Sequence, residues 1–241
     1  HISSYGIDFP DTENLYVDNP LASLIIAIGQ ISGVQRIRLG SLEPRIITEE
    51  FVKKVAKVEQ FCPHFHLSLQ SGSSSVLERM NRKYTSEEYY DRILLLRKYF
   101  ENPAFTTDVI VGFPGETDKE FEETLDFIKK VDFSYIHIFK YSRREQTRAY
   151  DMPNQIPDSI KKYRSDILKE AVEEMSERYK EGFIGKEQKI LVEETIVYEG
   201  NEYQVGHNER YLKLAIESCQ DLNNQIIKVR VVEKLNDEIL F

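Results

Sequence analysis

Polar and glycine-rich loops follow the predicted strands of this chain, each at the point where a strand ends. Because ligands of parallel α/β folds bind at the carboxyl ends of the strands, the side chains of these loops are candidates to hold a small polar ligand. Five such loops on one rim favour a ligand site over ordinary turns. They are residues 3–6, 41–44, 70–75, 112–117 and 141–144.

The loop at residues 112–117 was compared with phosphate-binding loops. It lacks the Gly-Lys-Ser/Thr ending of the Walker pattern, so a nucleoside triphosphatase is not expected. Gly112 would let a flat adenine approach the strand closely, with Val109 and Val111 as an apolar wall. A tight strand-to-helix turn capped by Thr117 is the structural alternative, and the two roles are compatible.

Four residues on or just before the predicted strands could do chemistry or serve structure. His64 and His66 lie on the same face of a strand, but no carboxylate or cysteine stands at a companion spacing, so structural histidines are favoured over a metal pair. For Cys62, a small buried side chain is favoured over a nucleophile. Asp108 lies within an apolar strand, where it would be a hydrogen-bond acceptor in the site or the partner of an arginine.

A basic cluster stands at the same rim, after the last predicted strand of the sheet. Basic side chains interleaved with aromatic ones can bind RNA phosphates and stack bases, although surface arginines are often simply solvated. The cluster is formed by Lys140, Arg143, Arg144 and Arg148, flanked by Tyr141 and Tyr150.

Short apolar runs alternate with helical patterns, which predicts an α/β fold with a parallel sheet. We expect strands at residues 34–40, 65–70, 105–111 and 135–140, and a fifth as a stub at residues 1–2. Thr85 with Glu88 and Thr117 with Glu120 predict capping boxes at two helix starts. One long helix is expected over residues 157–182.

After residue 182 the periodicity changes to that of short strands. Turn residues at 200–201 and 223–224 separate alternating or β-branched runs, which indicates a small barrel of about five strands. We therefore expect one domain over residues 1–182 and an all-β domain over residues 183–241.

The composition limits the classes of function. Hydrophobic residues make up 41% of the chain and charged residues 30%, with no apolar run long enough for a membrane span, so a cytoplasmic protein without a membrane partner is expected. The net charge of −9 argues against indiscriminate binding of nucleic acid, so any such contact must be local. The first residues resemble the end of a strand, and we expect the chain to begin part-way through a longer protein.

Four strings in this order resemble the methylthiotransferase family of radical S-adenosylmethionine (SAM) enzymes. They are HLSLQSGS at 66–73, VLERMNRKYT at 76–85, TDVIVGFPGET at 107–117 and HIFKYS at 137–142. The string RLGSLEP at 38–44 is most similar to the branch that modifies N6-threonylcarbamoyladenosine in tRNA. The resemblance covers essentially the whole chain, and the last residues look like the TRAM module, an OB-like barrel that holds tRNA in these enzymes.

The resemblance implies a partial TIM-like barrel of βα units that binds SAM on a [4Fe–4S] cluster, with a second [4Fe–4S] cluster on an upstream domain. It also implies methylthiolation of adenosine C2 at tRNA position 37 through a 5′-deoxyadenosyl radical, with an electron-donor protein as a further partner. By matching position, Gln70, Ser71 and Ser73 would lie near the methionine or ribose of SAM, and Val111 and Gly112 near its adenine. Further pocket candidates are Glu43, Arg82, Asp108, Phe139 and Tyr141.

The chain departs from the family in its cysteines. The family holds its cluster with a Cys-x-x-x-Cys-x-x-Cys loop, whereas this chain has only Cys62 and Cys219. We therefore expect no metal ligand and no catalytic residue within these 241 residues, and no activity from this chain alone.

The last domain departs as well, because residues 183–241 carry seven Lys and Arg against eleven Asp and Glu. RNA affinity there must come from a local patch, for which the candidates are Arg210, Lys213, Lys228 and Arg230.

Other readings stay open from the sequence. The branches acting on isopentenyladenosine in tRNA or on a ribosomal protein carry similar motifs. A protein of another class, a non-catalytic RNA-binding protein built on a degenerate barrel, is the remaining alternative.

Overall fold

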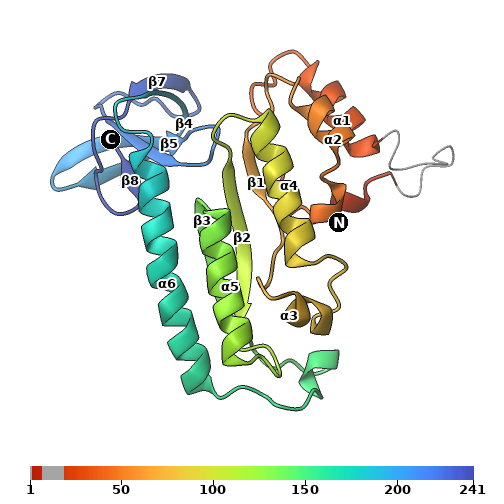
Figure 1. Cartoon of the computed structure of the whole chain (residues 1–241). Helices are drawn as coiled ribbons and strands as arrows, with labels where there is room; N and C mark the ends of the chain where they lie inside the picture. Colours follow the sequence, from red (N-terminus) through yellow and green to blue (C-terminus); the bar gives the residue numbers. More distant parts are fainter. Residues whose placement is uncertain (1, 7–18) are drawn as a thin grey trace.

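The computed structural model describes residues 2–6 and 19–241, and it contains an α/β unit followed by a β unit (Figure 1). The α/β unit is built on a parallel sheet with the order β1-β2-β3. Its strands are β1 (His64–His66), β2 (Ala104–Val111) and β3 (Tyr135–Lys140). His66, Thr106 and Tyr135 lie side by side in the register of the three strands. The expectation of a parallel sheet is therefore confirmed.

A fourth extended segment lies beside β1 but forms no regular strand. Ile37 pairs with Phe61 and Leu42 pairs with Leu67, both in parallel. Within the described residues, the segment forms only these two isolated bridges. The prediction of a regular strand at residues 34–40 is therefore wrong. Ile37 and Leu42 are five positions apart, so in a regular strand their side chains would lie on opposite faces. Both are buried in the core, so the alternation of faces breaks between them, near Gly40.

The prediction that the chain starts with the end of a strand is also wrong at Ile2, the described residue of that stretch. Ile2 begins a 3₁₀ turn, η1 (Ile2–Ser4), and His1 lies outside the described residues.

Helices cover one face of the parallel sheet, and neighbours in the row α1-α2-α4-α5-α6 contact each other (Figure 1). Both predicted capping boxes are confirmed, at Thr85 with Glu88 and at Thr117 with Glu120. Capping of this kind satisfies amides that have no partner within the helix. The helices are α1 (Pro20–Gly29), α2 (Glu49–Val55), α3 (Ser74–Arg79), α4 (Ser86–Tyr99), α5 (Asp118–Val131) and α6 (Asp158–Glu181), with the 3₁₀ turns η2 (Pro44–Ile46) and η3 (Arg148–Tyr150).

Side chains of β2 alternate between the two faces of the sheet. Phe105, Val109 and Val111 are buried in the core beneath the helices, whereas Asp108 and Ile110 on the other face are partly exposed. Burial of this apolar face against the helices is the main favourable term that holds the α/β unit together.

The β unit is a five-stranded sheet with the order β7-β4-β5-β6-β8. After β7 the chain continues along the sheet, because Val231 pairs with Lys186 and Glu233 pairs with Phe241 next to β8. The sheet therefore curls back on itself. Its strands are β4 (Glu187–Tyr198), β5 (Asn201–His207), β6 (Lys213–Glu217), β7 (Ile226–Arg230) and β8 (Ile239–Leu240).

The β unit packs on the amino-terminal end of the parallel sheet, opposite the end toward which the β2 arrow points (Figure 1). Arg36 donates hydrogen bonds to the carbonyls of His207 (2.7 Å) and Lys189 (2.9 Å). The guanidinium of Arg38 lies 3.7 Å from the ring centre of Tyr211. The long helix α6 connects the two ends of the structure, about 36 Å along its axis.

In the described part of the chain, no helix is both long enough and apolar enough to cross a membrane.

Candidate functional site

The carboxyl ends of the parallel strands bring several predicted site residues together through their backbones. Gln70 donates its N–H to the carbonyl of Asp108 (2.9 Å), and Ile110 donates to the carbonyl of Gln70 (2.9 Å). The N–H of Tyr141 donates to the carbonyl of Val111 (2.9 Å). We call this end of the sheet, with Gln70, Asp108, Val111, Gly112, Phe139 and Tyr141, the rim.

The loop that follows β1 is fastened to helix α5. The hydroxyl of Ser71 lies 3.1 Å from that of Thr124, and the Ser73 hydroxyl donates to Glu123 (2.6 Å). At the next turn, Ser75 donates to the carboxylate of Glu120. The hydroxyls predicted to face a ligand, those of Ser71 and Ser73, therefore bond to α5 in this structure, which fixes the loop in place.

Gly72 is required by the same packing. A Cβ at this position would lie 2.8 Å from the Cα of Thr124 and 2.7 Å from the Cβ of Phe127, closer than real side chains come. The loop and α5 can approach this closely only because residue 72 has no side chain.

The loop that follows β2 is fixed by a buried ion pair that the sequence did not reveal. Gly112 donates its N–H to both carboxylate oxygens of Glu116 (3.1 Å each), and Arg164 of α6 donates to Glu116 (2.7 Å) and to Asp118 (2.7 Å). Burial raises the pKa of Glu116, while the Gly112 amide and Arg164 oppose that shift. The pair holds the end of β2 against α6.

Gly112 has the backbone conformation of the tight strand-to-helix turn that the sequence offered as the structural alternative. Its φ of +74° lies in the left-handed region, and a Cβ would come within 2.4 Å of Cγ of Lys161. The stem of Lys161 from α6 fills the space in which a side chain at residue 112 would lie.

Tyr141 carries the one polar group of the rim that is buried without a partner among the described residues, its hydroxyl. Its ring meets Phe113 edge to face, with centroids 5.4 Å apart, and the Lys161 ammonium lies 5.5 Å from its centre. A buried hydroxyl costs free energy unless it is hydrogen-bonded, so this hydroxyl is a candidate to form a hydrogen bond with a ligand.

The other face of the sheet carries the predicted residues Asp108 and Phe139. Asp108 lies 3.5 Å from Nε2 of His66, whose Nδ1 lies 3.0 Å from the Thr106 hydroxyl. The partner of Asp108 is thus a histidine and not an arginine. Burial lowers the pKa of His64 to about 4, so this histidine is neutral near pH 7.

Glu43 and Arg82 are the remaining cofactor candidates. Glu43 pairs with Arg45 at 3.3 Å, and its backbone N–H donates to the Ser3 hydroxyl (3.0 Å). Arg82 is half-buried next to Tyr84, whose pKa burial raises to about 12. Neither side chain contacts a rim residue through a hydrogen bond within the described ranges.

The predicted RNA-binding residues separate into two groups at opposite ends of α6. At the rim, Arg143 donates to the Tyr150 carbonyl (2.7 Å), while Arg144 and Arg148 are exposed. In the β unit, Arg210 and Lys213 are already engaged. Arg210 donates to the carbonyls of Asn102 (2.7 Å) and Glu101 (2.8 Å) in the α/β unit, and Lys213 pairs with Glu194 (2.7 Å). Lys228 and Arg230 stay exposed on β7.

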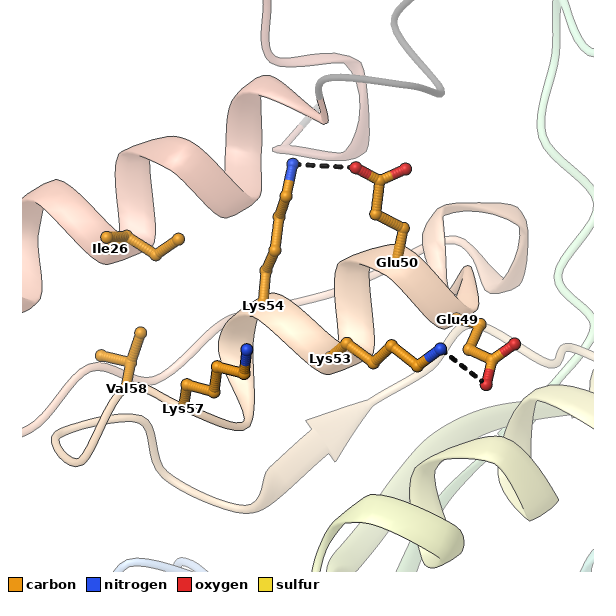
Figure 2. A pocket seen from close by; sticks show the side chains of 7 residues that line it. All are labelled: Ile26, Glu49, Glu50, Lys53, Lys54, Lys57 and Val58. Carbon is orange, nitrogen blue, oxygen red and sulfur yellow. Dashed lines mark ion pairs between the residues drawn. The ribbon is translucent and has the colours of Figure 1, made fainter.

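A surface pocket lies between α1 and α2, away from the rim (Figure 2). Ile26 and Val58 supply its apolar wall, and two of its three lysines are neutralised within α2 by the pairs Glu49–Lys53 (3.1 Å) and Glu50–Lys54 (2.9 Å). These are ordinary i,i+4 pairs of a helix surface, so the pocket offers no chemistry comparable to that of the rim.

Comparison with known proteins agrees with the fold. The family model of the Radical SAM superfamily matches residues 11–128. Among solved structures, coproporphyrinogen III oxidase from Escherichia coli, a radical SAM enzyme, is similar with a TM-score of 0.50 and 20% identity, over 70% of this chain and 38% of that one. The chain thus has the α/β partial barrel of that class.

The curated proteins similar in sequence to this chain include tRNA methylthiotransferases. Threonylcarbamoyladenosine tRNA methylthiotransferase MtaB of Thermotoga maritima is 42% identical over 88% of this chain and 46% of its own length. A tRNA-2-methylthio-N(6)-dimethylallyladenosine synthase of Caldicellulosiruptor saccharolyticus is 39% identical over 80% of this chain and 40% of its length. The chain belongs to the radical SAM superfamily, and it spans about half the length of these curated relatives or less.

The superfamily implies SAM and a [4Fe–4S] cluster, and the two fit this chain differently. The buried, unpartnered hydroxyl of Tyr141 and the exposed ring of Phe139 at the rim suit a nucleoside ligand. The cluster does not fit, because two cysteines are fewer than the thiolates it requires, and the described residues hold no group of three His, Cys, Asp or Glu that could bind a metal.

Substituting Gly72 tests the close packing of the loop at residues 70–75 against α5. We expect Gly72→Ala to lower the free energy of unfolding by about 1–3 kcal/mol, because the new methyl group must push the loop away from α5. Urea denaturation measures this. Gly40→Ala is the matched control, since a Cβ there meets nothing within 4 Å. Equal stability of the two variants would contradict the close approach.

The pH dependence of stability tests the ion pair between Arg79, on the helix α3 that follows this loop, and Glu120 of α5. Two hydrogen bonds from Arg79 are the main reason that the pKa of Glu120 falls from 4.5 to about 2. A carboxylate with a lowered pKa stabilises the fold above its unfolded pKa, and this contribution is lost as the pH falls from about 4.5 toward 2.

We therefore expect Glu120→Gln to lose on the order of 1–2 kcal/mol at pH 7 and to show a shallower decline of stability over that range. Denaturation at pH 7, 4.5 and 3 measures the slope. Glu122→Gln, an exposed carboxylate of the same helix, serves as control. An unchanged slope in Glu120→Gln would refute the role of this ion pair.

Proposed function

We propose that the protein to which this chain belongs transfers a methylthio group to C2 of N6-threonylcarbamoyladenosine at tRNA position 37. The 42% identity to a methylthiotransferase of that specificity, over 88% of this chain, is the observation that carries the proposal. The family model of the radical SAM superfamily matches residues 11–128, which include the rim residues Gln70, Asp108, Val111 and Gly112, and the fold is that of radical SAM enzymes.

Within this proposal, residues 1–182 form the radical SAM core and the rim binds SAM. The Tyr141 hydroxyl hydrogen-bonds the cofactor, Val111 and Gly112 supply backbone beside its adenine, and Gln70 lies toward its ribose. After one-electron reduction by a donor outside these 241 residues, bound SAM would supply the radical chemistry that activates the C2–H bond of the adenosine. The buried pair Glu116–Arg164 and the contacts of the 70–75 loop with α5 hold the rim in shape, so little ordering is needed when the ligand binds.

Residues 183–241 form the tRNA-holding unit in this proposal, in the manner of a TRAM module. Lys189 and Lys228 lie directly opposite each other on β4 and β7, and both are exposed. Like charges at facing positions of a sheet repel, so a phosphate between them would relieve an unfavourable contact. Neither ammonium group forms an ion pair within the described residues, and the contact of Lys189 with the α/β unit uses only its backbone carbonyl, which accepts from Arg36.

Methylthiolation of dimethylallyladenosine is the second candidate, because a relative with that activity is 39% identical to this chain. Mass spectrometry of tRNA nucleosides from cells lacking the gene separates the two. We expect loss of 2-methylthio-N6-threonylcarbamoyladenosine and accumulation of its unthiolated precursor. Loss of the dimethylallyl counterpart would move the protein to the other branch, and no change in either nucleoside would contradict tRNA methylthiolation.

The phosphate contact at β7 has its own test. We expect Lys228→Ala in the full-length protein to weaken tRNA binding and to reduce the slope of log affinity against log salt by about one. Fluorescence anisotropy at several salt concentrations measures both. Lys213→Ala is the control, because Glu194 already neutralises this lysine. Equal slopes for wild type and Lys228→Ala would exclude the patch.

A further inference from the structure

The loop at residues 207–212 of the β unit covers the start of β1 in the α/β unit. Tyr211 lies in this loop, and its ring stacks on that of His207 with centroids 4.2 Å apart. The guanidinium of Arg38, from the α/β unit, lies 3.7 Å from the centre of the same ring. One face of a ring has no room for two groups at these distances, so Tyr211 is held between Arg38 and His207. The two units therefore meet through a stack of three planar groups.

The shape of this loop is set within the β unit itself. The side-chain oxygen of the buried Asn208 accepts hydrogen bonds from the backbone N–H groups of Arg210 (2.9 Å) and Leu212 (3.0 Å). These bonds hold Tyr211 at a φ of +62°, in the left-handed region that a tyrosine seldom adopts. The loop can therefore separate from the α/β unit without losing its own conformation.

His64 lies beneath the loop as a buried imidazole. Its ring lies 5.5 Å from that of Tyr211, and its side chain is buried. On the same side of the sheet, His66 is half-buried and His137 is exposed. The β unit is thus what covers His64, and separation of the loop would expose this histidine to water.

The site accommodates a neutral imidazole and offers no partner to a charged one. Nε2 of His64 lies 3.4 Å from the Thr106 hydroxyl, whereas Nδ1 is buried without a partner among the described residues. An imidazolium has two N–H donors, so a protonated His64 would bury a charge with one donor unpaired.

The groups around His64 do not balance a positive charge on it. Arg38, His66 and Asp108 lie around it from the α/β unit, and His207, Glu193 and Glu209 from the β unit. Asp108 pairs with His66 (3.5 Å) and Glu193 pairs with His207, while none of the carboxylates in the described part of the chain forms an ion pair with His64. A proton on His64 would therefore add a second buried cation next to Arg38.

We infer that the contact between the two units is acid-sensitive, and that protonation of His64 releases the loop at residues 207–212 from the α/β unit. This inference does not depend on the proposed function. In the open state the hydrogen bonds from Arg36 and Arg210 to carbonyls of the other unit are broken as well. The β unit then stays attached through α6 alone, and its orientation relative to the α/β unit is no longer fixed.

The pH range of this effect follows from the pKa of His64 in the two states. Burial, and next to it Arg38, lowers this pKa to about 4 in the closed state. The exposed histidine of the open state has the ordinary pKa of about 6.5. As the pH falls below 6.5, the open state binds a proton that the closed state does not bind, so opening is favoured. The effect grows about tenfold per pH unit and levels off below about 4, where the closed state is protonated as well.

A tryptophan in the loop makes opening measurable, because the chain contains no other tryptophan. Urea titrations of the 241-residue chain carrying Tyr211→Trp follow the loop by fluorescence and the helices by circular dichroism. We expect an opening constant about tenfold larger at pH 5.5 than at pH 7.5, with the fluorescence changing before the helices unfold. Adding His64→Gln, which cannot be protonated in this range, should remove the difference between the two pH values. Adding His137→Gln, at an exposed histidine of the same sheet, is the matched control and should preserve it.

An NMR titration of the unsubstituted chain keeps the test independent of these variants. We expect the His64 ring to titrate with a midpoint about one pH unit or more below 6.5. A midpoint at about 6.5 would overturn the inference, because the β unit would then not protect this histidine. An opening constant equal at the two pH values would also overturn it. A pH difference that survives His64→Gln would contradict the role of His64 and assign the effect to His207 with Glu193.

Discussion

The close packing of the loop at residues 70–75 against helix α5 is the contact on which the rim depends. Gly72 leaves no room for a side chain between the loop and the helix, and the serines on both sides use their hydroxyls to bond α5. Because the loop continues directly from β1, this contact sets where Gln70 lies relative to Asp108 on the neighbouring strand. The rim is thus shaped by a helix that contributes none of the residues that define the rim.

Helix α6 plays the corresponding part on the other side of the rim. Arg164 and Lys161 reach from its first turns to the loop that follows β2, and they decide both the conformation at Gly112 and the surroundings of Tyr141. The same helix ends at the β unit, where Arg36 and Arg210 join the two units through backbone carbonyls. A change in the position of α6 would therefore alter the rim and the β unit together.

Local sequence patterns were sufficient for the elements that are regular. The bounds of β3 and α6 and both capping boxes follow from periodicity and from hydroxyl–carboxylate spacing, which are properties of neighbouring residues. The segment around Ile37 was predicted as a strand because it is apolar, but its pairing with the segment that contains β1 is interrupted. Its own residues do not show which of them form hydrogen bonds with the neighbouring segment.

The position of the rim could be predicted from the sequence because the carboxyl ends of parallel strands lie at one edge of the sheet. The contacts that hold the rim in shape could not be predicted. Glu116 and Arg164 are separated by 48 positions, and Lys161 belongs to a helix whose pattern reads as an ordinary stripe facing a core. The hydrogen bonds from Arg210 to the carbonyls of Glu101 and Asn102 likewise join the two units. Counting basic residues in the sequence could not predict them. Long-range contacts of this kind depend on how the elements pack.

A titration of the isotope-labelled chain with S-adenosylhomocysteine, followed by NMR, tests most directly whether the rim is the nucleoside site. The account predicts amide shifts concentrated at Gln70, Gly112 and Tyr141, with little change in the β unit. Shifts concentrated at the amino-terminal ends of the strands or in the pocket between α1 and α2, or no shifts at millimolar ligand, would contradict it.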